Sequence, residues 1–306
     1  MLKRIITLFK LGRKVAQSDI LKITSKFQEP PLLVKILFKI LSFSFSPKKE
    51  ADLVKDEGER LSSSLESMGT TFIKLGQFLA TRPDIIGEEL SKKLENLQDK
   101  LPPFSLFEAK EIIKNDLGSD TYNSIINLSE PVAAASIAQV HKAQINDGGT
   151  IKDVAIKILR PEIKRIFNEE IDAMMLFAFF IESFVKKTKR LKLVEVVFLL
   201  KEITNLEMDL RFEAAAANEY AENTKNDIGF RVPQIYWNFT SENVMTLDWV
   251  EGVSIRETEK LKERNLNTEK IAEDIIQNFL RHAVRDGFFH ADMHQGNIFI
   301  DNNGHI

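Results

Sequence analysis

The sequence predicts an α+β fold in which a small sheet is inserted between helices. Apolar residues recur at spacings of three and four through about residues 51–80, as on one face of an amphipathic helix. From residue 130 the spacing becomes strand-like, on either side of an Asp-Gly-Gly turn at 147–149. Helical spacing then returns from 165 to about 222. Helices, a hairpin and further helices in this order are typical of an α+β domain.

Other elements can be placed between these. A helix over about 85–97 is stopped by Pro102 and Pro103. Ser105 and Glu108 have the spacing of a capping box and should start a short helix. Strands are expected at 132–145, 153–159, 232–239 and 244–249, and a helix at 267–286 that stops at Gly287. The sequence closes with a loop, a short strand and an Asp-Asn-Asn-Gly turn.

Composition excludes several classes of protein. The chain has 306 residues, enough for two lobes with cores of their own or for one large domain. A net charge of −3 does not suit a nucleic-acid-binding protein, so no nucleic-acid partner is expected. The absence of cysteine excludes disulfides, thiolate metal sites and cysteine nucleophiles.

The N-terminal region predicts contact with a membrane surface. Residues 1–28 contain seven Lys or Arg and the single acid Asp19, interleaved with apolar residues. Such a segment either packs as a solvated helix on its own domain or lies on an anionic membrane. No apolar run reaches the roughly 18–20 residues that a spanning helix needs. The two closest, 32–45 and 173–185, carry charges and are expected to be amphipathic or core helices.

The segment from His290 to Asn297 predicts phosphoryl-transfer chemistry. Kinase-type phosphotransferases need an Asp that orients or deprotonates the acceptor and an Asn that holds magnesium, and both must reach the γ-phosphate. Asp292 and Asn297 stand five residues apart, between a long helix and an apolar strand. Alternatively, His290, Asp292 and His294 would share one face of a strand and could ligate a metal. A purely structural loop is the third possibility.

Lys157 ends the strand segment Val-Ala-Ile-Lys. A charged amine on a buried strand is costly unless it is paired, and kinases use such a lysine to hold the α- and β-phosphates. The helix downstream carries dense acids between apolar residues, so one of them should pair with Lys157. Before the strand, the small residues Ala133 to Ser136 occupy the place of a glycine-rich phosphate loop. Alanine disfavours the positive φ angles that glycine provides there.

Taken together, these features resemble the UbiB family of atypical protein-kinase-like proteins, which are linked to ubiquinone biosynthesis. The resemblance runs from about Leu65 to the last residue. Besides the segments already described, its hallmarks are Lys74-Leu75-Gly76-Gln77, Leu97-Gln98-Asp99 with the two prolines, and Glu207-Met208-Asp209. It implies a protein-kinase-like N-lobe and a partial C-lobe, preceded by an N-terminal helical extension.

The resemblance also implies a role for each matched residue. Asp292, Lys157 and Glu213 would be catalytic, with Glu213 pairing Lys157, and Asn297 would bind Mg²⁺. The regulatory residues would be Lys74 and Gln77, on an extension folded over the active site, and Glu207 and Asp209, which would meet that extension. Because two residues of spacing do not put Glu207 and Asp209 on one face of a helix, one should contact Lys74 while the other serves the helix or metal. ATP would be contacted by Val132, Ala133, Ala134, Ala135, Ser136, Val140, Lys157, Met245, Asp248, Trp249 and Val250.

Four segments are expected. Residues 1–50 would be a basic amphipathic segment and 51–128 the helical extension. Residues 129–250 would form the N-lobe with inserted helices, and 251–306 part of the C-lobe. Gln295 stands where the family usually has proline. The family's Asp-Phe-Gly and its later helices and membrane segments would follow Ile306, and Asp301 is no substitute, so the chain is expected to be a fragment.

The leading functional hypothesis is an ATP- and Mg²⁺-dependent atypical kinase or ATPase of the ubiquinone pathway. Its expected partners are ubiquinone-pathway proteins or an isoprenoid lipid, on the cytoplasmic side of a bacterial inner membrane. One alternative is a small-molecule phosphotransferase of the aminoglycoside or choline kinase type. The extension at 74–77 and the Ala-rich loop argue against it. Another is a non-catalytic nucleotide- or lipid-binding scaffold, which would suit the truncated chain.

Overall fold

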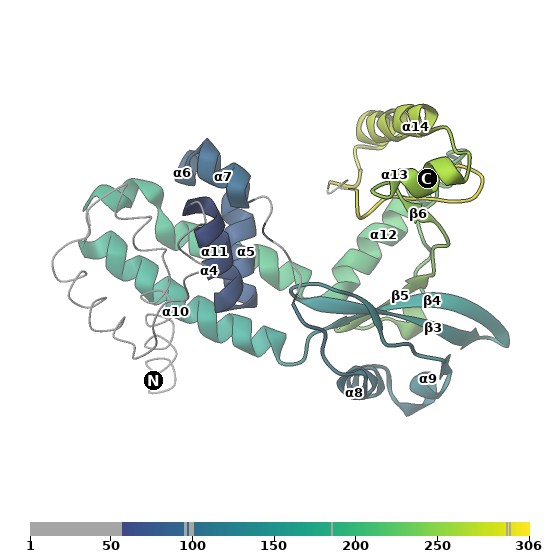
Figure 1. Cartoon of the computed structure of the whole chain (residues 1–306). Helices are drawn as coiled ribbons and strands as arrows, with labels where there is room; N and C mark the ends of the chain where they lie inside the picture. The colour runs from purple at the N-terminus through teal and green to yellow at the C-terminus, as the bar shows by residue number, and fades with distance from the viewer. Residues whose placement is uncertain (1–56, 95–96, 98–100, 185, 292, 294) are drawn as a thin grey trace. The chain divides into compact units, whose positions relative to one another are not determined.

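The computed structural model describes residues 57–306 except 95–96, 98–100, 185, 292 and 294 (Figure 1). The predicted basic segment 1–50 lies outside the described residues. The described residues fall into two compact units. A helical unit holds residues up to 102 together with 134–138 and 160–208. A sheet unit holds 103–133, 139–159 and 209–306.

The described part of the helical unit is built from two groups of helices. The first group is α4 (Glu57–Met68), α5 (Thr70–Ala80), α6 (Pro83–Ile86) and α7 (Glu88–Leu94). The second is α10 (Ile163–Phe184), the 3₁₀ turn η2 (Lys186–Leu191) and α11 (Leu193–Glu207). The helical stretch predicted over about 51–80 is confirmed from residue 57 on, but it is divided: Gly69, with a φ of 107°, interrupts it between α4 and α5.

Gly76 allows close packing within the first group of helices. Leu65, Phe72 and Leu94 are buried there. A Cβ atom at Gly76 would lie 2.9 Å from a methyl carbon of Leu65 and 2.9 Å from one of Leu97. Glycine therefore removes the bulk that would separate α5 from its neighbours.

The sheet unit contains β1 (Ile125–Ile126), β2 (Pro131–Ala134), β3 (Ala138–Asp147), β4 (Thr150–Leu159) and β5 (Val244–Asp248). The hairpin of β3 and β4 around residue 148 and the strand β5 were predicted, whereas β1 was not. The order is β1-β3-β4-β5, and β2 also pairs with β3. The β4–β5 ladder is antiparallel and sets Lys157 opposite Met245.

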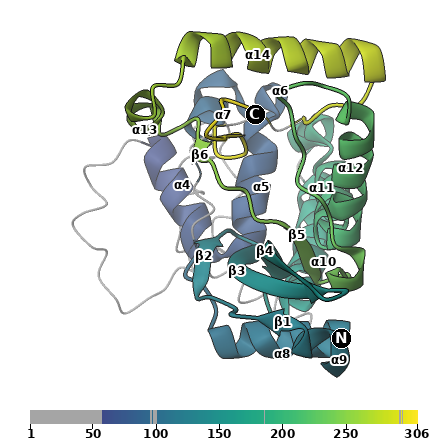
Figure 2. The same ribbon diagram turned by 90° about the vertical axis from the view of Figure 1, so that its right-hand side faces the viewer.

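A helix covers one face of this sheet. α8 (Leu106–Leu117) buries Ala109 and Ile113 against alternate strand residues such as Ile145 and Ile156. The short α9 (Ser119–Asn123) follows it (Figure 2). The predicted capping box is confirmed, with both hydrogen bonds between Ser105 and Glu108 present. Thus α8, which falls inside the predicted extension 51–128, packs on the sheet.

Three predicted elements differ in the structure. The strand over 132–145 is two strands, because the chain turns at 135–137, where Ala135 N–H donates to the carbonyl of Ala138. The segment 232–239 is a single bridge followed by the 3₁₀ turn η3 (Trp237–Phe239), because Pro233 cannot donate to a ladder. The helical stretch predicted over 165–222 is divided into α10, η2, α11 and a further helix, α12 (Leu210–Thr224), which Asp209 caps with its side chain accepting from Arg211 N–H.

The rest of the sheet unit leads to the 290–297 loop. β6 (Val253–Ser254) precedes α13 (Thr258–Glu263) and α14 (Thr268–Arg281), and β7 (Phe299–Ile300) pairs with β6. After α14 the chain makes one π-helical turn, η4 (His282–Asp286), and ends it at Gly287 in the left-handed region, where the sequence predicted the stop. In the part of the chain that the structure describes, no helix is both long and apolar enough to cross a bilayer.

Candidate functional site

Lys157 and Glu213 form the ion pair that the sequence predicted. Lys157 Nζ lies 2.7 Å from both carboxylate oxygens of Glu213. Val154, Ile156 and Ile158 of β4 are buried in the core, so the half-buried Lys157 projects from the other face of the sheet. Glu213 stands in the first turn of α12, where a negative charge is favoured by the helix dipole. The pair therefore joins the sheet to the start of α12.

The face that carries Lys157 also carries other predicted nucleotide contacts. Met245 lies directly opposite Lys157 in the ladder. On β3, Val140 and Lys142 alternate with core residues, and Lys142 Nζ sits 4.7 Å from the ring centroid of Trp249. Val250 follows and is 42% exposed. This face of the sheet therefore carries the charged Lys157 and Lys142 together with the apolar Val140 and Met245.

The side chain of Asp248, another predicted nucleotide contact, bonds to residues outside the predicted nucleotide site. Its carboxylate accepts hydrogen bonds from Tyr236 Oη at 2.7 Å, from Arg231 at 2.5 Å and from the backbone N–H of Gln234 at 3.2 Å. Burial, followed by the contact with Asp248, raises the pKa of Tyr236 to about 12. Because Asp248 is paired with the core residue Val154 in the ladder, its side chain lies on the opposite face from Lys157. Only its backbone is left for a nucleotide.

Arg160 fixes the Ala-rich loop and was missed by the sequence analysis. Its guanidinium donates to the carbonyl of Ala135 at 3.0 and 2.8 Å, and to the carbonyls of Pro102 and Leu101 at 2.8 and 3.2 Å. Ser136 is buried, and its carbonyl accepts from Thr70 Oγ1 at 3.3 Å. The loop is therefore held through its carbonyl groups. An arginine that binds only backbone carbonyls gives no pattern in a sequence.

Of the two predicted regulatory acids, Glu207 contacts Lys74 and Asp209 does not, as their two-residue spacing predicted. Lys74 Nζ lies 2.7 Å from Glu207 Oε2, and the side chains are 15% and 38% exposed. That oxygen is buried and makes no aligned hydrogen bond, so the contact is ionic. Asp209 instead caps α12 and pairs with Arg211 at 2.7 Å. Gln77 is half-buried on the same helix as Lys74.

The 290–297 loop is described in part. Asp292 and His294 lie outside the described residues, and Asn297 is exposed. At the C-terminal end of the loop, Ser254 Oγ donates to the carbonyl of Gln295 at 2.7 Å. Among the described residues no group of three or more acids and histidines could hold a metal. The metal-site alternative stays a prediction, because two of its three residues are undescribed.

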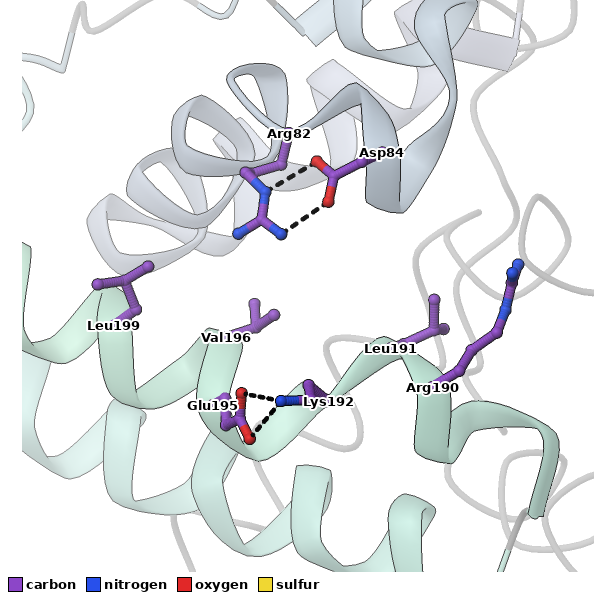
Figure 3. A pocket seen from close by; sticks show the side chains of 8 residues that line it. All are labelled: Arg82, Asp84, Arg190, Leu191, Lys192, Glu195, Val196 and Leu199. Atoms are coloured by element: carbon purple, nitrogen blue, oxygen red, sulfur yellow. Dashed lines mark hydrogen bonds and ion pairs between the residues drawn. The ribbon is translucent and has the colours of Figure 1, made fainter.

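A pocket of about 390 Å³ is present in the helical unit. Figure 3 shows the Arg82–Asp84 pair on one side of it and the Lys192–Glu195 pair on the other. Leu191, Val196 and Leu199 line it as well, together with Arg190. None of these residues belongs to the predicted nucleotide site.

Comparison with known proteins identifies the family. Residues 96–306 match the ABC1 atypical kinase-like domain. The chain is 35% identical over 274 residues to a probable protein kinase UbiB of Marinobacter nauticus, covering 89% of this chain and 49% of that protein. The corresponding protein of Azotobacter vinelandii is 33% identical, with 90% and 51% covered. The chain spans about half the length of these curated relatives.

A solved structure supports the same conclusion. The complex of Rv3197 with erythromycin, from Mycobacterium tuberculosis, matches 83% of this chain and 63% of its own at 27% identity, with a TM-score of 0.51. The match to the ABC1 domain model favours the kinase-like family over the aminoglycoside and choline kinase types. The chain has the predicted α+β, kinase-like fold and belongs to the UbiB family of atypical protein-kinase-like proteins.

Proposed function

We propose that this chain is the nucleotide-binding part of an atypical kinase or ATPase that supports ubiquinone biosynthesis. The observation that carries the proposal is the Lys157–Glu213 pair, at 2.7 Å, on the face of the sheet away from the core. A lysine fixed in this way presents a positive charge to phosphate groups while its partner keeps it in one position.

The remaining residues suit Mg·ATP. The side-chain amide oxygen of Asn297 is a ligand type that Mg²⁺ accepts. Backbone amides of Val132 to Ser136 can donate to phosphates, while Val140, Met245, Trp249 and Val250 offer apolar contact to the adenine. When bound, the metal neutralises charge on the phosphates. Asp292 would then orient the acceptor hydroxyl or water as the acid of the 290–297 loop.

We expect Lys157→Ala to weaken Mg·ATP binding at least about tenfold, because the phosphates lose their fixed positive partner. The measurement is the shift in melting temperature of the 306-residue chain with increasing Mg·ATP. Lys152→Ala, at an exposed lysine of the same strand, is the matched control and should bind as the unmodified chain does. A shift that is absent in the unmodified chain, or equal in Lys157→Ala, would contradict the proposal.

The proposed activity takes place at a membrane surface, where an isoprenoid lipid or ubiquinone-pathway proteins would be met. Residues 1–28, with seven basic side chains and one acid, support this part of the proposal. We expect the chain to co-sediment with vesicles containing anionic lipid and to lose most of this binding when residues 1–28 are removed. Vesicles of neutral lipid are the control. Equal binding of both forms at low salt would refute the role of the segment.

A further inference from the structure

A row of buried polar groups connects α12 to η4, the turn before the 290–297 loop. Tyr220 is 7% exposed and His282 is fully buried. Tyr220 Oη lies 2.7 Å from His282 Nδ1, and His282 Nε2 lies 2.9 Å from Asp227 Oδ2. Phe288, two residues before His290, packs its ring against that of Tyr220. The chain that leads into the loop is thus in contact with a side chain from α12.

The direction of each hydrogen bond follows from Asp227. Hydrogen bonds from Arg285, with the contact to His282, lower the pKa of Asp227 to about 2, so its carboxylate only accepts. Arg285 reaches both Asp227 oxygens, at 2.7 and 2.9 Å. His282 Nε2 must therefore carry a proton, and in the neutral ring Nδ1 accepts from the Tyr220 hydroxyl.

Aromatic rings enclose these groups. The ring of Phe230 lies 5.5 Å from that of Tyr220 and 4.7 Å from that of His282, and Phe288 lies 6.3 Å from Tyr220. Hydrogen bonds shielded from water in this way are stronger, and the loss of one partner costs more. Burial also raises the pKa of Tyr220 to about 12, which keeps its proton in place for donation.

Helix geometry connects these groups to the ion pair. Glu213 and Tyr220 are seven residues apart on α12, which is close to two turns, so both project from the same side of the helix. Figure 2 shows α12 running from the sheet toward the end of α14. One helix therefore holds Lys157 near its start and, two turns later, packs against Phe288, which leads into the loop. The other end of the loop is held independently, by Ser254.

We propose that Tyr220 and His282 are positioning residues that couple nucleotide binding at Lys157 and Glu213 to the order of residues 287–291, which lead into the 290–297 loop. The inference rests on the proposed function, which places the phosphates at Lys157 and makes this loop the site of Asp292 and Asn297. Neither Tyr220 nor His282 touches the nucleotide in this scheme. They act through α12 and through the packing of Phe288 on Tyr220.

The test is hydrogen exchange of the full chain, with and without magnesium and a non-hydrolysable ATP analogue. In the Tyr220→Phe variant, which keeps the aromatic ring, the backbone amides of 287–291 should exchange roughly threefold to tenfold faster than in the unmodified chain when no nucleotide is present. The protection that nucleotide gives this segment should also disappear, while nucleotide still binds. Thr224→Val is the matched control. It removes another buried hydroxyl of α12, bonded only to the Tyr220 carbonyl at 2.8 Å, and should leave both readings unchanged.

The outcomes separate this inference from the proposed function. If the unmodified chain binds no nucleotide, the proposed function fails, and faster exchange in free Tyr220→Phe still supports the anchoring of residues 287–291. If nucleotide binds and Tyr220→Phe keeps the protection, the coupling is wrong. Histidine ¹⁵N chemical shifts give a second measurement. These shifts should show a proton on His282 Nε2, and Tyr220→Phe should change them. A neutral ring with its proton on Nδ1 would contradict the hydrogen-bond directions given above.

Discussion

Asp227→Ala is expected to lower the free energy of unfolding by about 3–5 kcal/mol, the range for breaking a buried charged pair from one side. The Asp227 side chain is 6% exposed and holds both His282 and Arg285. Without it the imidazole N–H is buried with no acceptor. Arg285 keeps Asp286, at 2.6 Å, which should place the loss near the lower end of the range. Urea unfolding measures it as a lower midpoint with an unchanged m-value.

Glu273→Ala is the control for this variant. It removes an exposed acid from α14 and should change stability by less than about 0.5 kcal/mol. A loss in Asp227→Ala no larger than in the control would show that the buried acid does not hold the turn after α14.

The pH dependence checks the same carboxylate in the unmodified chain. Its pKa is about 2 when folded and 3.8 in the reference state, so folding favours the ionised form. The stabilisation is fully present above about pH 4 and is lost as the pH falls toward 2, amounting to about 2 kcal/mol. Asp227→Asn should therefore lose less stability than the unmodified chain between pH 5 and pH 2. Parallel curves would contradict the assignment.

Lys74→Ala is expected to lower the free energy of unfolding by about 2 kcal/mol. Glu207 Oε2 is a buried atom whose charge is balanced by Lys74 at 2.7 Å, and truncation leaves that charge uncompensated. The value is below the range for fully buried pairs because the Glu207 side chain is 38% exposed and water screens part of its charge. Thermal or urea unfolding of the full chain measures the loss.

Two variants make this result specific. Lys201→Ala removes a looser contact with Asp172, at 3.9 Å, and should cost less than about 0.5 kcal/mol. Adding Glu207→Gln to Lys74→Ala removes the unpaired charge and should restore part of the lost stability. Losses that simply add in the double variant would show that the two side chains do not depend on each other.

The ion pairs at Lys157 and Lys74 were predictable because a lysine near the core requires an acid, and the family resemblance indicated which of the many nearby acids would supply it. For Lys74, the two-residue spacing of Glu207 and Asp209 already excluded a shared face. Strand alternation would also have separated Asp248 from Met245 and Trp249, since alternate residues face opposite sides of a sheet. The group of predicted nucleotide contacts therefore mixed two faces.

The hydrogen bonds around Tyr220 were not predictable in the same way. Tyr220 and His282 are 62 residues apart, and His282 and Asp227 are 55 apart. A lone tyrosine or histidine on a helix is equally consistent with ordinary core packing. The seven-residue spacing from Glu213 was present in the sequence, but it acquires meaning only once the partner of Tyr220 is known. The break at Gly69 was missed because helical spacing continues across it.

The π-helical turn η4 determines how α14 is joined to the loop that follows. A π turn bonds each residue to the fifth along the chain, one more than an α turn, so it contains one additional residue. Each residue of an α-helix advances the chain by roughly 100° about the axis. Deleting a single residue between His282 and Asp286 would restore α geometry and rotate everything after it by about that angle. Phe288 would then no longer pack on Tyr220, although no side chain had been replaced. A length change here is therefore more disruptive than most point substitutions.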